Sequence, residues 1–456
     1  MAGIGFELRR LIQRDSLLSL VRAYAYAGII SSGPWVLSIV GMVAIGILGA
    51  LNRTAGEAMV QFQVTVTWTI AISLILTGFF QLAFTRFVAD RLFEHRADIV
   101  APNYHAVLLT VTVIATVLSG LAAVTLFPMQ TVAYRVLLVA AFVVACDIWI
   151  ATVFLSGLKH YRSIVALYLL GYGTTVTVSV SLGEHGVEGL LAGFVIGQVL
   201  LFSSMHLIIL RNFVTPQAMS FEFFERRYRY PSLIWIGFLF NFGAWIDKLI
   251  FWFWPPTSQV VIGPLRASVI YDLPVFLAYL SIIPGMAVFL VRIETDFVDH
   301  YDGFYDAVRN GGSLERIERH RNRMIETVRG GIFEILKIQA IATLLLFFAG
   351  ERLLSALTMS DLYLPLLHVQ TVAAGLQVLF LSILTVYFYL DKRKVVLMLT
   401  ALFVVGNATL TSVSLWLGPV YYGYGFAASL LICVVVGFKA LERSFSRLEY
   451  STFMLQ

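Results

Sequence analysis

Long, uninterrupted runs of apolar residues alternate along the chain with short polar segments. Most runs are close to or above the ~20 residues that an α-helix needs to cross a bilayer. They are continuously apolar rather than alternating, which favours helices over the strands of a membrane barrel. The pattern predicts an all-α polytopic membrane protein with twelve transmembrane helices, at 23–50, 61–85, 105–127, 133–156, 163–182, 187–210, 231–254, 268–291, 333–350, 362–390, 395–417 and 421–440.

Composition agrees with this interpretation, since 59% of the 456 residues are hydrophobic and only 13% are charged. Soluble domains contain about 25% charged residues. Most loops are short, which leaves no room for a catalytic domain outside the membrane. Cys146 and Cys433 both lie in apolar runs, where they are expected to be small buried side chains.

The Lys and Arg residues predict the orientation, because cytoplasmic loops carry an excess of them. Of the 32 basic residues, 26 fall in the segments on one side of the twelve spans. The opposite side has only Arg53, Arg135, Arg266 and Arg352. Both termini are therefore predicted to be cytoplasmic. The net charge of +5 is explained by this topology and by anionic lipid rather than by nucleic acid.

Two short internal repeats predict two six-helix lobes. SSGPW at 31–35 resembles NFGAW at 241–245, and GVEGLLAG at 186–193 resembles YGYGFAAS at 422–429. An even number of spans gives both lobes the same membrane orientation, so we expect a pseudo-twofold axis along the membrane normal with the site between the lobes. The predicted parts are an interfacial helix at 1–22, an N-lobe at 23–210, a basic linker at 211–230, a C-lobe at 231–440 with a cytoplasmic helical insertion at 292–332, and a tail at 441–456.

The first 22 residues and the insertion both carry amphipathic patterns. Apolar residues such as Phe6 and Leu11 alternate with Arg9, Arg10 and Arg14 at helical spacing, as in a helix lying at the membrane interface. Within the insertion, Ser313 can cap a helix whose apolar face has two possible roles. It folds back on the protein, or it docks a cytosolic partner. The face consists of Ile317, Met324, Ile325 and Val328, and the candidate docking residues are Arg226, Arg227, Arg229, Arg316, Arg319 and Arg323.

Four charged residues lie well inside predicted spans, where each costs roughly 2.5–3.5 kcal/mol and is unlikely to face lipid. Adjacent helical residues point about 100° apart. We therefore expect Lys248 to pair with Asp272 or Asp147, which leaves Asp247 facing a central cavity. Such a set forms a structural ion-pair network, lines a translocation path, or couples transport to protons or sodium. The candidates are Asp147, Asp247, Lys248 and Asp272, with Asn241 and Trp245 beside them.

Glycine and proline mark four positions where spans are predicted to bend. Gly33 and Pro34 interrupt the first span, and Pro274 and Pro284 interrupt the eighth. No phosphate-binding loop, nucleophile elbow or metal-binding motif is present in the sequence. We therefore expect neither enzymatic activity nor a metal or other cofactor.

Several stretches together resemble the PelG-like transporters of the MOP superfamily: MAGIGFELRRL at the start, SSGPW in the first span, VRIETDF at 291–297, and the helical insertion after it. The resemblance implies translocation of a growing Pel-type exopolysaccharide, rich in N-acetylgalactosamine and galactosamine, across the bacterial inner membrane for the biofilm matrix. It also implies a cytosolic PelF-like glycosyltransferase and PelD-like and PelE-like membrane partners, of which PelD carries a cyclic-di-GMP receptor domain.

The deep charges depart from the pattern of relatives that flip pyrophosphate-linked lipids, which use basic cavities. Three Asp accompany one Lys in these spans. Such a balance favours a neutral or cationic sugar chain over an anionic pyrophosphate. The competing hypotheses are a flippase for a lipid-linked oligosaccharide, an ion-coupled small-molecule antiporter of the same fold, and a membrane scaffold without a transport path.

Overall fold

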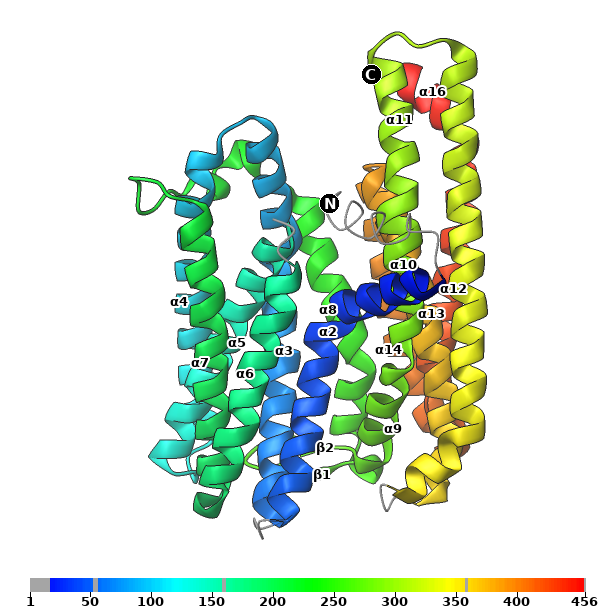
Figure 1. The fold of residues 1–456 in the computed structure, drawn as a ribbon. Helices are drawn as coiled ribbons and strands as arrows, with labels where there is room; N and C mark the ends of the chain where they lie inside the picture. Colours follow the sequence, from blue (N-terminus) through cyan, green and yellow to red (C-terminus); the bar gives the residue numbers. More distant parts are fainter. Residues whose placement is uncertain (1–16, 52–55, 158–160, 357–359, 455–456) are drawn as a thin grey trace. The chain divides into compact units, whose positions relative to one another are not determined.

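The computed structural model describes residues 17–51, 56–157, 161–356 and 360–454, and almost all of them are helical (Figure 1). The helices are α2 (Leu17–Leu51), α3 (Gly56–Phe93), α4 (Val100–Leu126), α5 (Val132–Gly157), α6 (Tyr161–Leu182), α7 (Gly186–Asn212), α8 (Pro231–Phe253), α9 (Val269–Leu280), α10 (Ile282–Val291), α11 (Val298–Arg309), α12 (Leu314–Ala356), α13 (Leu364–Tyr389), α14 (Arg393–Leu417), α15 (Tyr424–Ser446) and α16 (Leu448–Met454). A π-helix, η6 (Arg292–Phe297), joins α10 to α11. The predicted helix at 1–22 lies mostly outside the described residues.

Within the described ranges, nine helices are long and apolar enough to cross a membrane, or ten if the bent pair α9 and α10 forms one span. One of the nine is the 50-residue run Ser163–Asn212, which holds both α6 and α7. These two helices fold back on each other, because Gly193 packs on Ser179 while Gly197 packs on Thr175. The chain is a multi-pass membrane protein. Twelve spans fit these segments, and that number stays a prediction.

The chain forms two compact units. The first unit consists of Met1–Ser32 and Ile270–Gln456, and the second unit is Gly33–Val269. α8 belongs to the second unit because it packs along α3. The chain therefore passes from one compact unit to the other at Gly33 and at Ile270, and the linker 211–230 lies within the second unit. The division into six-helix lobes remains a prediction from the repeats.

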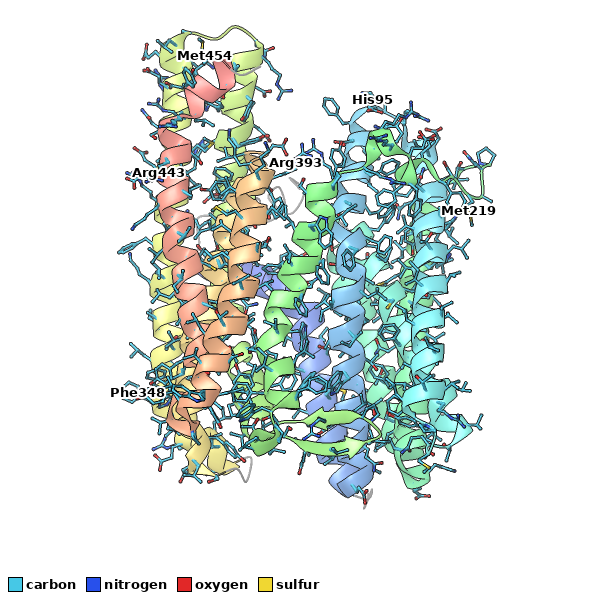
Figure 2. The ribbon with its side chains drawn as sticks, turned by 180° about the vertical axis from the view of Figure 1, so that it is seen from behind. His95, Met219, Phe348, Arg393, Arg443 and Met454 are labelled. Atoms are coloured by element: carbon cyan, nitrogen blue, oxygen red, sulfur yellow. The ribbon has the colours of Figure 1, made fainter. Side chains whose placement is uncertain are left out.

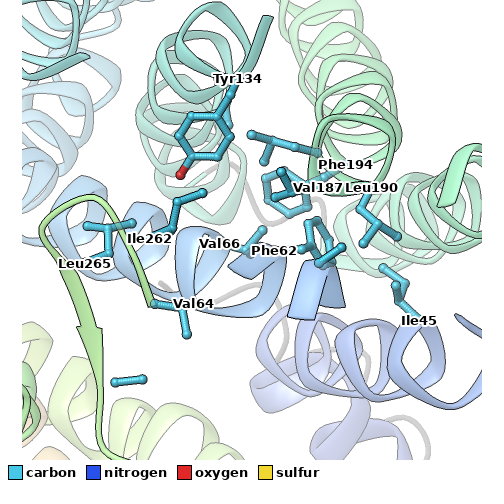
Figure 3. Packing of buried hydrophobic residues seen from close by; sticks show 14 of the residues in the cluster. Ile45, Phe62, Val64, Val66, Tyr134, Val187, Leu190, Phe194, Ile262 and Leu265 are labelled. Atoms are coloured by element: carbon cyan, nitrogen blue, oxygen red, sulfur yellow. The ribbon is translucent and has the colours of Figure 1, made fainter. Parts of the chain in front are cut away.

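A small β-hairpin follows α8 in the second unit, where the sequence predicts only a loop. Its strands β1 (Gln259–Ile262) and β2 (Leu265–Ala267) pair antiparallel around Gly263, whose φ is +54°. Ile262 and Leu265 pack into a buried cluster with Phe62 and Tyr134 (Figure 3). The run VVIGPLRA, with β-branched residues before a Gly-Pro turn, is the signal that could have predicted it.

Two hydrogen bonds between side chains and backbone carbonyls hold the hairpin against α3 and α8. The indole Nε1 of Trp68 donates to the Arg266 carbonyl at 2.8 Å. The guanidinium Nε of Arg266 in turn donates to the Trp252 carbonyl at 3.0 Å. The Trp68 and Trp252 rings lie 4.6 Å apart. The hairpin is therefore an integral part of this end of the second unit.

The linker 211–230 is packed on the second unit. The Asn103 side chain accepts a hydrogen bond from the Phe223 amide at 2.9 Å, and Phe223 is buried against Phe84 and Phe87. The Tyr230 hydroxyl donates to Asp90 at 2.6 Å. His95 and Met219 lie at this same end of the unit (Figure 2). The linker is thus a folded strap across the ends of α3 and α4.

The insertion 292–332 folds back on its own protein, which is the first of the two alternatives for its apolar face. Ile317, Met324 and Val328 are buried, as is Phe304 of α11. Gly303 allows the close approach of His320 from α12. Arg321 of α12 forms an ion pair with Glu449 of α16. α11, α16 and the beginning of α12 lie together at one end of the first unit (Figure 1), whereas Phe348 lies near the other end of α12 (Figure 2).

The second sequence repeat corresponds to the same structural feature in two places, a glycine that packs on a backbone carbonyl of the preceding helix. Gly189 lies in the first turn of α7 and packs on the Leu182 carbonyl of α6. Gly425, at the matching position 236 residues later, packs on the Leu410 carbonyl of α14. A side chain at either position would collide with backbone, so each glycine lets two antiparallel helices touch directly.

Candidate functional site

Asp247 and Lys248 are both buried in α8, with exposed fractions of 0% and 6%. The Lys248 Nζ lies 3.1 Å from Asp247 Oδ2 and 3.3 Å from Oδ1. It also donates to the Ala244 carbonyl at 3.0 Å. The expectation that these neighbours do not neutralise each other is therefore wrong.

The reason lies in the direction of helical side chains. Side chains on a helix lean toward its N-terminus, and the four-carbon stem of lysine reaches back over the preceding turn. Nζ of Lys248 thus arrives near Ala244, on the same level as the Asp247 carboxylate. The 100° between adjacent residues separates their Cβ atoms but does not separate the ends of a long side chain.

Asn241 lies at the crossing of α8 with α3 and has a structural contact there. Its Nδ2 donates to the Leu74 carbonyl at 3.1 Å, and its exposed fraction is 9%. One turn away, Gly237 meets the backbone of Gly78 directly. Two glycines and an amide therefore bring the α3 and α8 backbones together beside the buried ion pair.

Trp245 is a partly exposed aromatic residue of this region. Its ring lies 5.9 Å from Lys248 Nζ, within the range of a cation–π interaction. It also lies 6.1 Å from the ring of Trp252, which is buried. This part of α8 therefore combines a buried ion pair with aromatic rings.

Asp147 lies in the middle of α5 and is 6% exposed. Thr112 of α4 donates a hydrogen bond to its Oδ1 at 2.9 Å. Within the described part of the chain, no Lys or Arg forms an ion pair with it. The predicted pairing of Lys248 with Asp147 is therefore wrong. α3 packs against both α5 and α8, so Asp147 of α5 and Lys248 of α8 lie at different helix–helix contacts.

We expect Thr112→Val to destabilise the protein by about 1–2 kcal/mol, because a buried carboxyl loses its hydrogen-bond donor. The thermal unfolding midpoint of the purified protein measures this. Thr116→Val is the matched control, since the exposed Thr116 hydroxyl bonds only to the Thr112 carbonyl of its own helix at 2.7 Å. Equal shifts for the two variants would contradict the role assigned to Thr112.

Asp272 lies in the first turn of α9, in the first unit, and is partly buried. A carboxylate there is stabilised by the positive end of the helix dipole. Its predicted approach to Lys248 stays a prediction.

The eighth span is bent by 41° at the break between α9 and α10. Pro274 lies inside α9, and Pro284 lies in the first turn of α10. Gln339 of α12 fills the break, where its Nε2 donates to the Ser281 carbonyl at 3.1 Å. Gln339 fits there because Gly285 and Gly375 have no side chains to exclude it. In α2, which is helical throughout Leu17–Leu51, Gly33 and Pro34 coincide with the boundary between the two units.

A cluster of charged side chains that the sequence analysis did not identify follows this bent span. Arg292, the first residue of η6, forms a fork with Glu334 of α12 at 2.6 and 2.7 Å. It also binds Asp296 at 2.8 Å. Such bidentate pairs are geometrically specific. They tie the π-helix to α12 at the point where the insertion begins.

The candidate docking arginines lie in two groups, each exposed at the end of its own unit. Arg227 pairs with Glu225 at 3.0 Å, and Arg229 donates to the Phe224 carbonyl at 2.9 Å. On α12, Arg319 pairs with Glu315 at 2.7 Å. Arg226, Arg316 and Arg323 are exposed as well. Among the described residues, no group of three or more His, Cys, Asp or Glu is arranged to hold a metal ion.

Comparison with known proteins gives both a family and a fold. Residues 1–453 match the family model for PelG, described as "Putative exopolysaccharide Exporter (EPS-E)". The fold is similar to an outward-facing MATE family multidrug resistance transporter of the MOP superfamily, with a TM-score of 0.70, 14% identity and 99% of each chain covered. A MOP superfamily transporter from Pyrococcus furiosus, described as having a binding pocket of reversed polarity, gives a TM-score of 0.65 at 13% identity, covering 93% of this chain and 96% of that one. No curated protein matches the sequence.

Proposed function

Because the chain belongs to the PelG family of exopolysaccharide exporters, we propose that it carries a growing Pel-type polysaccharide across the bacterial inner membrane. The polymer is rich in N-acetylgalactosamine and galactosamine. A cytosolic PelF-like glycosyltransferase supplies it, and both termini of the exporter are cytoplasmic. The observation that carries the proposal is the family match over 1–453 on a MOP-type transporter fold.

The charges in the membrane support a sugar cargo. The one lysine deep in the spans of the second unit pairs with its neighbouring aspartate, and Asp147 is the further acidic group there. The described spans of this unit thus have no surplus of positive charge to hold a pyrophosphate. Sugar rings bind on aromatic faces and need no excess of positive charge, and the partly exposed ring of Trp245 offers such a face.

The partners of this proposal are the PelF-like synthase and PelD-like and PelE-like membrane proteins. The exposed arginines offer them two surfaces: Arg226, Arg227 and Arg229 on the linker, and Arg316, Arg319 and Arg323 on α12. Because the linker is strapped to the second unit and α12 is packed on α11, both surfaces are rigid. Rigid surfaces bind at a lower entropic cost than flexible loops.

Loss of the exporter is expected to remove extracellular polymer while leaving polymer inside the cell. The test deletes the coding sequence, restores it on a plasmid, and measures polymer in both compartments with a lectin for N-acetylgalactosamine. Polymer outside the deletion strain would refute the proposal. A lipid-linked oligosaccharide accumulating at the inner leaflet would identify a flippase, and polymer export unchanged with ion-driven efflux lost would identify an antiporter.

A further inference from the structure

An apolar groove of about 630 Å³ lies between α12 and α15 of the first unit. Phe333 and Leu336 line it on α12, and Phe438 lines it on α15. Phe333 is 59% exposed and Leu336 is 42% exposed, although both are large apolar side chains. All three residues lie inside the spans predicted at 333–350 and 421–440. This part of the groove therefore opens toward the hydrocarbon of the bilayer, where acyl chains surround the protein.

The groove continues past the ends of these spans into the headgroup layer. Arg329 lines it four residues before Phe333, which is about 6 Å along α12 at 1.5 Å per residue. The headgroup layer adds roughly 5–8 Å beyond the hydrocarbon core. Arg329 thus lies at the depth of the lipid phosphates when Phe333 lies at the edge of the acyl chains. On α15, Arg443 lies three residues beyond the span that ends at 440, at about the same depth.

Basic side chains flank the groove near this depth: Arg329 and Lys337 on α12, and Lys439 and Arg443 on α15. All four are exposed, and none of them forms an ion pair among the residues that the structure describes. Nζ of Lys337 lies 4.4 Å from the centre of the Phe333 ring, so its side chain extends toward the end of the span. Glu442 is the acidic residue of the groove lining, and Arg321, farther out, already pairs with Glu449. The groove therefore joins an apolar surface to an excess of positive charge at the level of the phosphates.

We propose that this groove binds an anionic phospholipid. One acyl chain lies against Phe333, Leu336 and Phe438, and the phosphate lies at the level of Arg329 and Arg443. The planar guanidinium of arginine presents paired N–H donors that match the oxygens of a phosphate. A zwitterionic lipid carries an ammonium group beside its phosphate, which the basic side chains repel, so a lipid with a net negative charge is favoured. This contact does not depend on what the chain transports, so its failure would leave the proposed function intact.

The test places the photo-cross-linking residue p-benzoylphenylalanine at Phe333 in the full-length protein, reconstituted in nanodiscs of equal parts phosphatidylglycerol and phosphatidylcholine. Mass spectrometry measures the ratio of the two lipids among the adducts. Each basic side chain near an anionic lipid is worth about fivefold in binding, so we expect phosphatidylglycerol to exceed phosphatidylcholine at least about tenfold. Substituting Arg329→Gln and Arg443→Gln together should lower this preference about tenfold or more, because two of the phosphate contacts are lost.

Met398 of α14 provides the matched position for the cross-linker. It is an apolar residue that is 49% exposed and does not line the groove. It lies just inside the span predicted at 395–417, at nearly the same depth as Phe333. The cross-linker at Met398 should capture the two lipids in nearly equal amounts, because the lipid there is part of the ordinary bilayer.

Lys394→Gln together with Arg447→Gln provides the matched change of charge. Both residues are exposed basic residues near the ends of predicted spans, and neither lines the groove. This pair of substitutions should leave the lipid ratio at Phe333 unchanged, and an equal loss from it would refute a specific site. Equal capture of both lipids at Phe333, no lipid adduct there, or a preference that survives Arg329→Gln with Arg443→Gln would each overturn the proposal.

Discussion

The variant Gly237→Val is expected to prevent stable folding of the second unit. A side chain at Gly237 would collide with the carbonyl oxygen of Gly78, and a Cβ at Gly78 would lie 2.8 Å from the carbonyl of Gly237. The obstruction is backbone on both helices, so no rotamer change relieves it. Separating α3 from α8 would also break the Asn241 hydrogen bond to Leu74. We expect a loss of at least about 3 kcal/mol, at the upper end of overpacking effects.

The measurement is the thermal unfolding midpoint of purified protein, together with the fraction that elutes as a single species in detergent. Gly120→Val is the matched control, because a Cβ at Gly120 in α4 meets no atom within 4 Å. It makes the same chemical change in a membrane helix without a backbone contact. If Gly237→Val behaved like Gly120→Val, the close α3–α8 crossing would be wrong.

The second large effect is expected from Lys248→Met. This change leaves the Asp247 carboxylate, whose exposed fraction is 0%, without its ammonium partner at 3.1 Å. Breaking a buried pair by removing one partner typically costs about 3–5 kcal/mol, whereas removing both charges is often close to neutral. The double variant Asp247→Asn/Lys248→Met should therefore recover most of the stability that the single variant loses.

The double variant also separates the two roles proposed for this pair. If polymer secretion returns together with stability, the pair is structural. If stability returns but secretion at the same protein level does not, the charges act on the translocation path. A single variant Lys248→Met that is as stable as the original chain would contradict the pairing itself. Normal secretion by Asp247→Asn and Asp272→Asn at normal protein levels would remove both residues from the path hypothesis.

The sequence predicted the helices well because the requirement behind them is local. Each span must be apolar over its own length and must satisfy its own backbone hydrogen bonds, so a run such as 231–254 contains what is needed to predict α8 at Pro231–Phe253. The same holds for the buried face of α12, since Ile317, Met324 and Val328 repeat at helical spacing. The family resemblance carried by VRIETDF and the segments around it was confirmed over the whole chain.

The sequence could not determine which helices touch or which charges pair. Gly78 and Gly237 meet although 159 residues separate them, and no local pattern distinguishes them from Gly120, which meets nothing. Thr112 of α4 donates a hydrogen bond to Asp147 of α5. Lys248 pairs with Asp247 because its flexible side chain extends back along the helix to the level of that carboxylate. Such contacts depend on the distance between backbones and on rotamers. The sequence by itself therefore determined a multi-pass, transporter-like chain with costly charges inside its spans, while only the tertiary structure decided that Asp247 and Lys248 neutralise each other.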